Sequence, residues 1–506
     1  MFRLASWLFG LLIRLLFYLI FYGTPLIGFW LASSLAAYLG GPPWIAWVAG
    51  LLMFPVIPGI WELRAYAYRS PESKPWFSTL DRLSLRTFAV GLAFLAVMLY
   101  AFPQTAFVSL STRGDWMLDE VKDSRADTAR RVLFRAAGAL EWLYRATKTN
   151  PYKAHVDSEA RQRSEEATKQ LEQEAAQQRE KEAAQTGKAD QPSETESALK
   201  HENEAQQPAQ PELKWPWKGA TLHPAVSKMP ASAETSIESV ARYIAKHESD
   251  PILRIKALHD YVADRVAYDS QALYSGNIPD QDAQSVFNSR KSVCAGYANL
   301  LSALAAAIGE KGVVVTGDAR DEVTDDKLTG IGHAWNAARI GQHWYLIDAC
   351  WDSGYVSREK GFTKRYKIDY FLPPPEVMIQ DHFPEEPNWQ LLAKPLSQGE
   401  FLRQPMLNPS FQAADLRLIS PRRARIEAGS EAMVIVKNPQ NQWLMAGLEQ
   451  NGKEVGPSSD PTNSETAQLV CPLPDKGTYR LNMFVNEHQQ REGDYEFVGS
   501  VDFVNR

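Results

Sequence analysis

The chain has 506 residues, of which 45% are hydrophobic, with a formal net charge of −6 and a sequence pI near 5.9. This length gives room for two or three domains, and the composition suits at least one large apolar core. The acidic balance implies no general attraction to nucleic acid, and three cysteines are too few for a disulfide scaffold.

The first 110 residues are predicted to form a membrane anchor. Three apolar stretches are each near the ~20 residues that cross a bilayer, and we expect three transmembrane helices at residues 15–39, 44–61 and 88–108. A cleaved signal peptide is the alternative for residues 1–39. It is disfavoured because the apolar run is too long and two further spans follow it.

Basic residues predict how this anchor is oriented. Arg3 and Arg14 precede the first span, and the loop at 62–87 carries Arg64, Arg69, Lys74, Arg82 and Arg86. The positive-inside rule therefore places the N-terminus and this loop in the cytoplasm. Three crossings put the chain after residue 110 on the opposite side. In a bacterial cell we expect an inner-membrane protein with its main domain in the periplasm.

Two segments separate the anchor from that domain. Residues 111–155 are expected to form a helical juxtamembrane segment, because apolar residues recur among charged ones. Residues 156–213 are rich in Glu, Gln, Ala and Lys with almost no large apolar residue, which predicts a solvated helix or a disordered linker. We expect a spacer that holds the next domain away from the bilayer, and an acidic partner-binding tail is the alternative.

Residues 214–405 are predicted to be a catalytic domain that opens with two helices. The first shows apolar residues at helical spacing between Ile237 and Ile244. The second starts at Asp250-Pro251, a capping residue followed by proline at the first helical position.

A third helix is predicted to begin with Ser292 as its N-cap and to end at Gly309. Cys294 then lies in the first turn, where unpaired N–H groups and the positive end of the helix dipole lower a thiol pKa. The amide of Cys294 would also face a developing oxyanion.

Residues 333–340 and 343–351 are predicted to be strands joined by a two-residue turn at Gly341-Gln342. In that register His333 and Asp348 are diagonal neighbours on one face, roughly 5–8 Å apart at Cβ, close enough for their side chains to meet. The opposed pairs would be Ile340 with His343, Trp335 with Asp348, and His333 with Cys350.

Cys294, His333 and Asp348 are together typical of a nucleophile, a base and an orienting carboxylate. A thiol attacks as its thiolate and needs a base nearby, and that base needs a third group to set its tautomer. Taken singly, a cysteine near a helix start is more often a small buried apolar residue, and a histidine on a strand is usually structural. Their order and spacing favour the catalytic interpretation.

Several separated motifs in residues 235–395 carry a family resemblance, and they occur in a specific order. The motifs are Val293-Cys294-Ala295-Gly296-Tyr297-Ala298, His333-Ala334-Trp335-Asn336, Tyr370-Phe371-Leu372-Pro373, Asp381-His382-Phe383-Pro384 and Asn388-Trp389-Gln390. With these motifs the region resembles the transglutaminase-like superfamily, a relative of papain-fold cysteine peptidases, and more closely its kyphoscoliosis-peptidase type.

The resemblance implies Cys294 as the nucleophile, His333 as the base and Asp348 as the orienting carboxylate. The chain departs from the family at Asp348-Ala349-Cys350-Trp351, where the family usually has threonine in place of the cysteine. This second thiol raises the hypothesis of redox inhibition through a Cys294–Cys350 bond.

Cys350, Trp335 and Tyr297 are candidates for residues adjacent to the site, although core packing is the favoured interpretation of the two aromatic residues. No metal set is evident, because the histidines lack supporting cysteines or paired histidines at ligand spacing. No glycine-rich phosphate loop occurs either, and no cofactor is expected. The histidines considered were His333, His343 and His382.

Residues 406–506 are predicted to form a small β-sandwich, immunoglobulin-like in architecture. Short alternating runs are separated by turn signals such as Asn451-Gly452. This domain would bind an envelope protein partner or pack on the catalytic domain. The runs are residues 432–436, 443–448, 467–471, 479–485 and 495–504.

The sequence therefore predicts an α+β protein: a papain/transglutaminase-like core with an antiparallel sheet, between a three-helix membrane anchor and a small β-sandwich. The expected activity is acyl transfer on proteins or peptides through a thioester. Water would make the protein a cysteine peptidase or amidase, and an amine would make it a transglutaminase. The alternative is a catalytically inactive transglutaminase-like scaffold that binds partners in the cell envelope.

Overall fold

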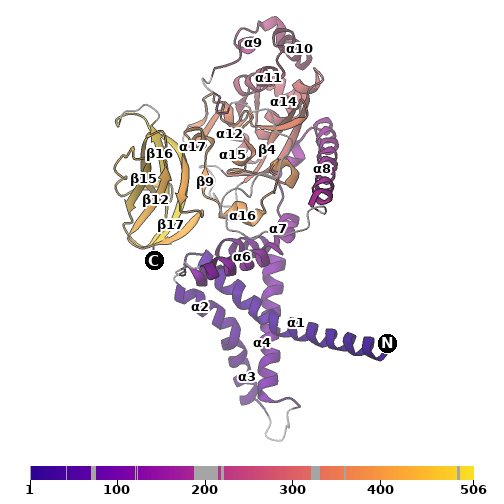
Figure 1. The fold of residues 1–506 in the computed structure, drawn as a ribbon, viewed down its shortest axis with the longest axis vertical. Helices are drawn as coiled ribbons and strands as arrows, with labels where there is room; N and C mark the ends of the chain where they lie inside the picture. The colour runs from indigo at the N-terminus through magenta and orange to yellow at the C-terminus, as the bar shows by residue number, and fades with distance from the viewer. Residues whose placement is uncertain are drawn as a thin grey trace.

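The computed structural model describes residues 2–41, 43–69, 76–119, 121, 124–186, 215–217, 221–320, 331–357, 360–486 and 491–505. In Figure 1 the N-terminal helices form a stem, a mixed α+β domain lies above it, and the C-terminal strands lie beside that domain. The short helices α6 (Ser124–Gly138) and α7 (Glu141–Thr147) lie between the stem and the two upper parts.

Three stretches of helix in the stem are long and apolar enough to cross a membrane: Arg14–Tyr38, Pro43–Ala67 and Thr79–Ala101. The first lies within α1 (Phe2–Tyr38). The second comprises α2 (Pro43–Leu51), a π-helical turn (Leu52–Val56) and α3 (Ile57–Ala67), and the third is α4 (Thr79–Ala101). The first two agree closely with the predicted spans.

The third span begins and ends earlier than the predicted 88–108. Ser78 caps α4 and forms a capping box with Asp81, so the helix begins well before Phe88. Pro103 starts a separate helix, α5 (Pro103–Arg113), because proline suits the first turn of a helix. The apolar residues of α5 that were assigned to the span are instead buried against other parts of the protein, such as Phe107 against Tyr144.

The basic loop is also shorter than predicted, because Arg82 and Arg86 belong to α4. Both pair with Glu62 of α3, at 2.9 and 2.6 Å. Glu62 is buried at one end of the second apolar stretch, so these pairs compensate the cost of placing a carboxylate there.

Helices occupy the juxtamembrane segment, as expected: α6 (Ser124–Gly138), α7 (Glu141–Thr147) and a 3₁₀ turn at Pro151–His155. The helix that follows, α8 (Ser158–Thr186), differs from the expected solvated helix. Ala160 and Ala167 are buried, and the Ser164 hydroxyl bonds both the carbonyl and the amide of Val314 at 2.8 and 3.0 Å. Small residues at helical spacing let α8 approach the sheet closely. Residues 187–213 of the predicted linker lie outside the described residues.

The central domain is built on an antiparallel sheet of strand order β5-β4-β3-β8. Its strands are β3 (Lys311–Ala319), β4 (Ile331–Ile340), β5 (His343–Ile347) and β8 (His382–Pro384). One face packs on α14 (Cys294–Ala306) through residues such as Val314 and Ala338. The other face packs on α8 through residues such as Val315 and Trp344. Covering both faces buries the sheet and everything that lies on it.

The two opening helices are those predicted, α10 (Ile237–His247) and α11 (Pro251–Arg265). The Asp250 carboxylate accepts hydrogen bonds from the amides of Ile252 and Leu253, at 2.9 and 3.0 Å. The proline at the first position has no N–H to satisfy, so the cap serves the next two residues.

The β4–β5 hairpin has the predicted register, from Ile340 opposite His343 to Asn336 opposite Ile347. The strand β5 is shorter than predicted and ends at Ile347. The Asp348 carboxylate accepts hydrogen bonds from the amides of Cys350 and Trp351, and this turns the chain into a 3₁₀ helix at Trp351–Ser353. The predicted pairs of Trp335 with Asp348 and of His333 with Cys350 are therefore wrong as strand partners.

The C-terminal part contains two sheets, of strand order β10-β12-β15 and β11-β17-β16-β13-β14, around one apolar core. Each predicted run is a strand, and Asn451 and Gly452 both have positive φ at the predicted turn. The immunoglobulin-like description stays a prediction. The strands are β10 (Arg417–Ser420), β11 (Arg425–Ala428), β12 (Glu431–Lys437), β13 (Trp443–Gln450), β14 (Lys453–Val455), β15 (Thr466–Pro472), β16 (Gly477–Asn486) and β17 (Glu496–Asn505).

Candidate active site

Cys294 lies in the first turn of α14, as predicted, where it is the first residue of the helix and is 1% exposed. The cap is not the predicted one: Val293 is the N-cap residue, and the Ser292 hydroxyl donates to the Val293 carbonyl at 2.9 Å. Two residues later the helix packs closely at Gly296, where a Cβ would meet Ser292 Cβ and Val286 Cγ2 at 2.6 Å. Glycine therefore sets how closely the start of this helix approaches its neighbours.

His333 on β4 joins Asp348 to Cys294. Its Nε2 lies 2.6 Å from Asp348 Oδ2, and the Cys294 side chain lies close enough to His333 to influence its charge. Because Nε2 is occupied by the carboxylate, Nδ1 is the nitrogen that remains for the thiol. The structure thus brings together the three residues that the sequence singled out.

In this cluster, burial and the neighbouring charges shift the pKa values in opposite directions. Burial would lower the pKa of His333, but the interactions with Asp348 and Cys294 outweigh it and raise this pKa to about 9. Burial would likewise raise the pKa of Asp348, but His333 and His382 together hold it well below its usual range. At neutral pH the imidazole of His333 is therefore protonated beside an ionised carboxylate.

His382 is a member of the cluster that the sequence did not identify. Its Nε2 lies 3.1 Å from the same Asp348 Oδ2, and its Nδ1 lies 2.6 Å from Asp381 Oδ1. In the sequence, His382 stood out only as part of the motif Asp381-His382-Phe383-Pro384, and no role was assigned to it. The link to Asp348 arises because β8 pairs with β3, a contact that no local pattern encodes.

His333, Asp348 and His382 also form a group whose nitrogen and oxygen atoms lie within 4.8 Å of one another, as metal ligands do. Two ligands of one tetrahedral zinc ion, each ~2.1 Å from it, are roughly 3.4 Å apart. The 2.6 Å between His333 and Asp348 is instead the length of a charge-assisted hydrogen bond. In this arrangement the two histidines each bond to Asp348.

The region that contains these residues is similar to a known protein family. Residues 238–349 match the family model described as the transglutaminase-like superfamily, and the matched span contains Cys294, His333 and Asp348. The chain carries a transglutaminase-like domain. The superfamily resemblance seen in the sequence motifs is thereby confirmed.

Several curated proteins are similar in sequence to the part of the chain that contains the transglutaminase-like domain. The chain is 28% identical over 282 residues to kyphoscoliosis peptidase of Mus musculus, which covers 52% of this chain and 39% of that protein. It is 26% identical over 259 residues to kyphoscoliosis peptidase of Homo sapiens, covering 50% and 39%. Hillarin of Drosophila melanogaster is 28% identical over 90 residues, covering 16% and 11%. The matches span about two fifths of the length of the first two relatives.

Cys350 lies beside Asp348 in the transglutaminase-like domain, close enough to Cys294 for their charges to interact. Burial raises the pKa of the Cys350 thiol well above its usual value, and the negative charges of Asp348 and Cys294 add to this. The three cysteines are free and buried. A Cys294–Cys350 bond under oxidation stays a prediction.

Of the two aromatic residues proposed to lie beside the site, Trp335 contacts the cluster and Tyr297 forms its hydrogen bonds elsewhere. The Trp335 ring stacks on His333 with centroids 5.9 Å apart, so it contacts the cluster directly. The Tyr297 hydroxyl instead donates to the Val266 carbonyl at 2.9 Å and accepts from the Ser353 hydroxyl at 3.2 Å. The Trp351 ring also packs near His333, with ring centroids 5.3 Å apart.

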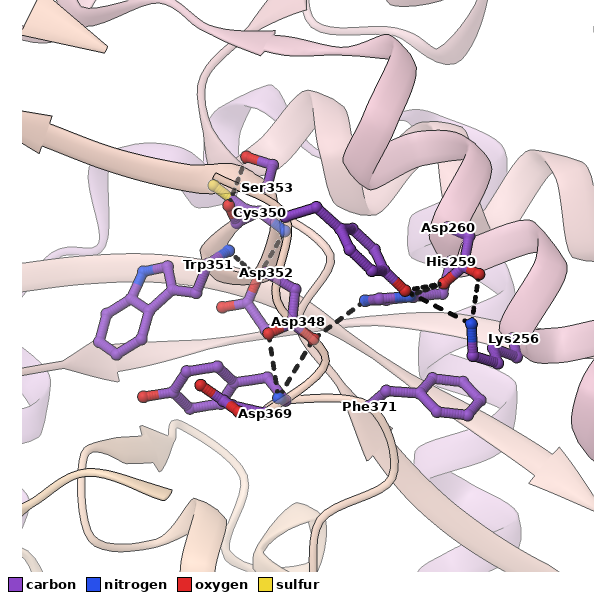
Figure 2. A network of polar contacts seen from close by, with 12 residues as sticks. Lys256, His259, Asp260, Asp348, Cys350, Trp351, Asp352, Ser353, Asp369 and Phe371 are labelled. Carbon is purple, nitrogen blue, oxygen red and sulfur yellow. Dashed lines mark hydrogen bonds and ion pairs between the residues drawn. The ribbon is translucent and has the colours of Figure 1, made fainter. Parts of the chain in front are cut away.

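A second polar network supports the turn that carries Asp348, and Figure 2 shows it from close by. His259 of α11 lies between the carboxylates of Asp260 and Asp352, and Lys256 pairs with Asp260 at 2.5 Å. Burial would lower the pKa of His259, but the two carboxylates raise it to about 9. The network ties α11 to the turn at 348–353.

Proposed function

We propose that this protein is a membrane-anchored thiol acyl-transfer enzyme, in which Cys294 attacks the carbonyl of an amide in a protein or peptide. One observation supports this above the others: His333 interacts electrostatically with the Cys294 side chain while its Nε2 lies 2.6 Å from Asp348. Such an arrangement favours a thiolate beside an imidazolium. Similarity to kyphoscoliosis peptidase over half of the chain is the second support.

The chemistry follows from these positions. The thiolate forms a C–S bond to the carbonyl carbon, and the tetrahedral oxyanion would receive hydrogen bonds from amides such as that of Cys294 in the first turn of α14. The imidazolium of His333 then protonates the leaving amine, the C–N bond breaks, and a thioester remains. Water resolves the thioester in a peptidase or amidase, and an amine resolves it in a transglutaminase. We favour hydrolysis of envelope proteins or peptides.

The anchor suggests where this reaction occurs. The three apolar helices suit membrane spans, and the basic residues beside the loop between α3 and α4 favour a cytoplasmic position for that loop. We propose an inner-membrane protein with the transglutaminase-like domain in the periplasm.

Alkylation by iodoacetamide near neutral pH tests the proposal on the full-length protein in detergent. We expect Cys294 to react far faster than Cys350 and Cys471, as judged by mass spectrometry of each cysteine peptide. His333→Ala should remove this preference, whereas the matched change His343→Ala, on the neighbouring strand, should leave it. Equal labelling of the three thiols would contradict the proposed enzymatic function.

A specific observation also favours the alternative of an inactive scaffold. Cys294 and His333 are 1% and 4% exposed, so a substrate carbonyl has to reach a covered thiol. In that case the transglutaminase-like domain and the C-terminal sheets would serve to bind an envelope protein. Slow alkylation of Cys294, with no effect of His333→Ala, is the outcome that the scaffold predicts.

A further inference from the structure

The Asp348 carboxylate is saturated with hydrogen bonds. Its Oδ1 accepts from the amides of Cys350 and Trp351, at 2.8 and 3.0 Å. Its Oδ2 contacts His333 Nε2 at 2.6 Å and His382 Nε2 at 3.1 Å. An ionised carboxylate oxygen has two lone pairs in its plane. The two imidazoles therefore share one oxygen.

His382 is held in place independently of His333. Its Nδ1 lies 2.6 Å from Asp381 Oδ1, and the Tyr370 hydroxyl donates to the other oxygen of Asp381 at 2.5 Å. The Trp351 ring packs on His382 with centroids 4.5 Å apart, and Trp335 meets it edge to face at 5.1 Å. The ring cannot rotate without breaking these contacts, so its Nε2 remains directed at Asp348.

We propose that His382 is a positioning residue for the acyl-transfer reaction: it holds Asp348 through the same oxygen that His333 contacts and divides the charge of the carboxylate between two imidazoles. The proposal rests on the proposed function. Its consequence is that His333 holds its proton less tightly than it would beside an unshared carboxylate, and so gives that proton more readily to the leaving amine.

Two effects of His382 act in the same direction. A second donor on Asp348 Oδ2 draws negative charge away from the bond to His333. A protonated His382, with its ring centroid 5.4 Å from that of His333, also disfavours a second positive charge there. Both lower the proton affinity of His333.

The surroundings of His382 keep it charged. The ionisable groups around it come from four other parts of the fold and from the end of its own strand. Burial would lower the pKa of His382, but the carboxylates of Asp381 and Asp348 outweigh burial and raise this pKa to about 9. Arg320 contributes its charge to this site through Asp381. The groups are Asp348 after β5, His333 on β4, Tyr370, Arg320 after β3, and Asp381 before β8.

The alkylation rate of Cys294 as a function of pH tests this role. Its alkaline inflection reports the loss of the proton from His333. In His382→Gln, which keeps a neutral amide donor, we expect the inflection to move to higher pH by about 1 unit. Asp381→Asn should move it in the same direction, because His382 loses a carboxylate that keeps it protonated. His343→Gln is the matched control and should leave the profile unchanged.

The outcomes separate this inference from the proposed function. If the natural protein shows neither fast labelling of Cys294 nor an inflection that depends on His333, the acyl-transfer function fails. If the natural profile is as expected but folded His382→Gln shows the same inflection, or one at lower pH, His382 is only structural. Circular dichroism and thermal melting establish folding. If His382→Gln does not fold, the Asp381→Asn profile decides by the same criterion.

Discussion

His259 Nε2 lies 3.1 Å from Asp352 Oδ2, and the amide of Asp352 donates to the carbonyl of Asp348 at 3.2 Å. An imidazole held between two carboxylates thus supports the candidate site from α11, as His382 does from β8. The two histidines differ in one respect: His382 contacts the carboxylate of Asp348 itself, whereas His259 contacts the turn that presents it.

Replacing the charge of Asp348 should impair Cys294. Asp348→Asn keeps the size of the side chain but removes the charge that favours the protonated form of His333. We expect the pKa of His333 to fall and any acyl-transfer rate to drop by roughly 10²-fold or more. Alkylation of Cys294 at neutral pH measures the effect, with the thermal midpoint as a control for folding. Unchanged labelling in a folded variant would exclude Asp348 from the chemistry.

Stability should fall in mild alkali. The folded pKa of His259 is raised to about 9, so the folded state binds its proton more tightly than the unfolded state, whose histidines titrate near ~6.5. The stabilisation is complete below pH ~6.5 and is lost as pH rises through about 9, in total of the order of 1–3 kcal/mol. Asp352, whose pKa burial raises to about 6, loses the rest of its proton at the acid end of this window, and it adds no slope above about pH 7.5.

Thermal melts between pH 6.5 and 9.5, followed by tryptophan fluorescence, check this dependence. His259→Gln should lower the melting midpoint at pH 6.5 and make the midpoint decline less steeply as the pH rises, because the variant lacks one of the histidines with a raised pKa. A variant with the same slope as the natural protein would show that His259 is not protonated in the fold.

The contact between the stem and the C-terminal sheets should depend on Arg113. Its guanidinium pairs with Asp119 and with Glu427, both at 2.5 Å, and its side chain is 5% exposed. Arg113→Gln leaves two acidic groups close together without their cation, and we expect a loss of about 3 kcal/mol. The exposed Arg417, which lies 3.9 Å from Asp415, provides the control, and Arg417→Gln should change stability by less than about 0.5 kcal/mol. Equal melting midpoints for both variants would contradict this.

Gly296→Ala should disturb the start of α14. The added Cβ would lie 2.6 Å from both Ser292 Cβ and Val286 Cγ2, so the helix must shift, at a cost of about 1–3 kcal/mol. The shift would move Cys294 relative to His333 and slow its alkylation. At Gly138 a Cβ meets nothing within 4 Å, and Gly138→Ala should leave both stability and labelling unaffected. Normal labelling in Gly296→Ala would mean that this close approach does not set the position of the thiol.

Reporter fusions test the proposed orientation. An enzyme that is active only in the periplasm should be active when fused after residue 506, and inactive when inserted between α3 and α4. The converse pattern would invert the anchor and place the transglutaminase-like domain in the cytoplasm.

Local chemistry explains how much the sequence predicted. The cap at Asp250, the turn at Gly341-Gln342 and the strand periods after residue 430 depend on neighbours a few residues apart, and the structure shows each of them. Hydropathy located the long apolar helices of the stem for the same reason. The third span was misplaced because a proline that a span tolerates also begins a new helix.

By itself the sequence determined the order of cysteine, histidine and aspartate, the hairpin register that brings His333 and Asp348 close, and the apolar helices of the stem. Only the tertiary structure decided that α8 covers the sheet, that β5 stops at Asp348, and that His382 shares the carboxylate with His333. The first set depends on hydrogen bonds and burial periods within short segments. The second depends on which distant surfaces exclude water together, and this is set only once the whole chain has packed.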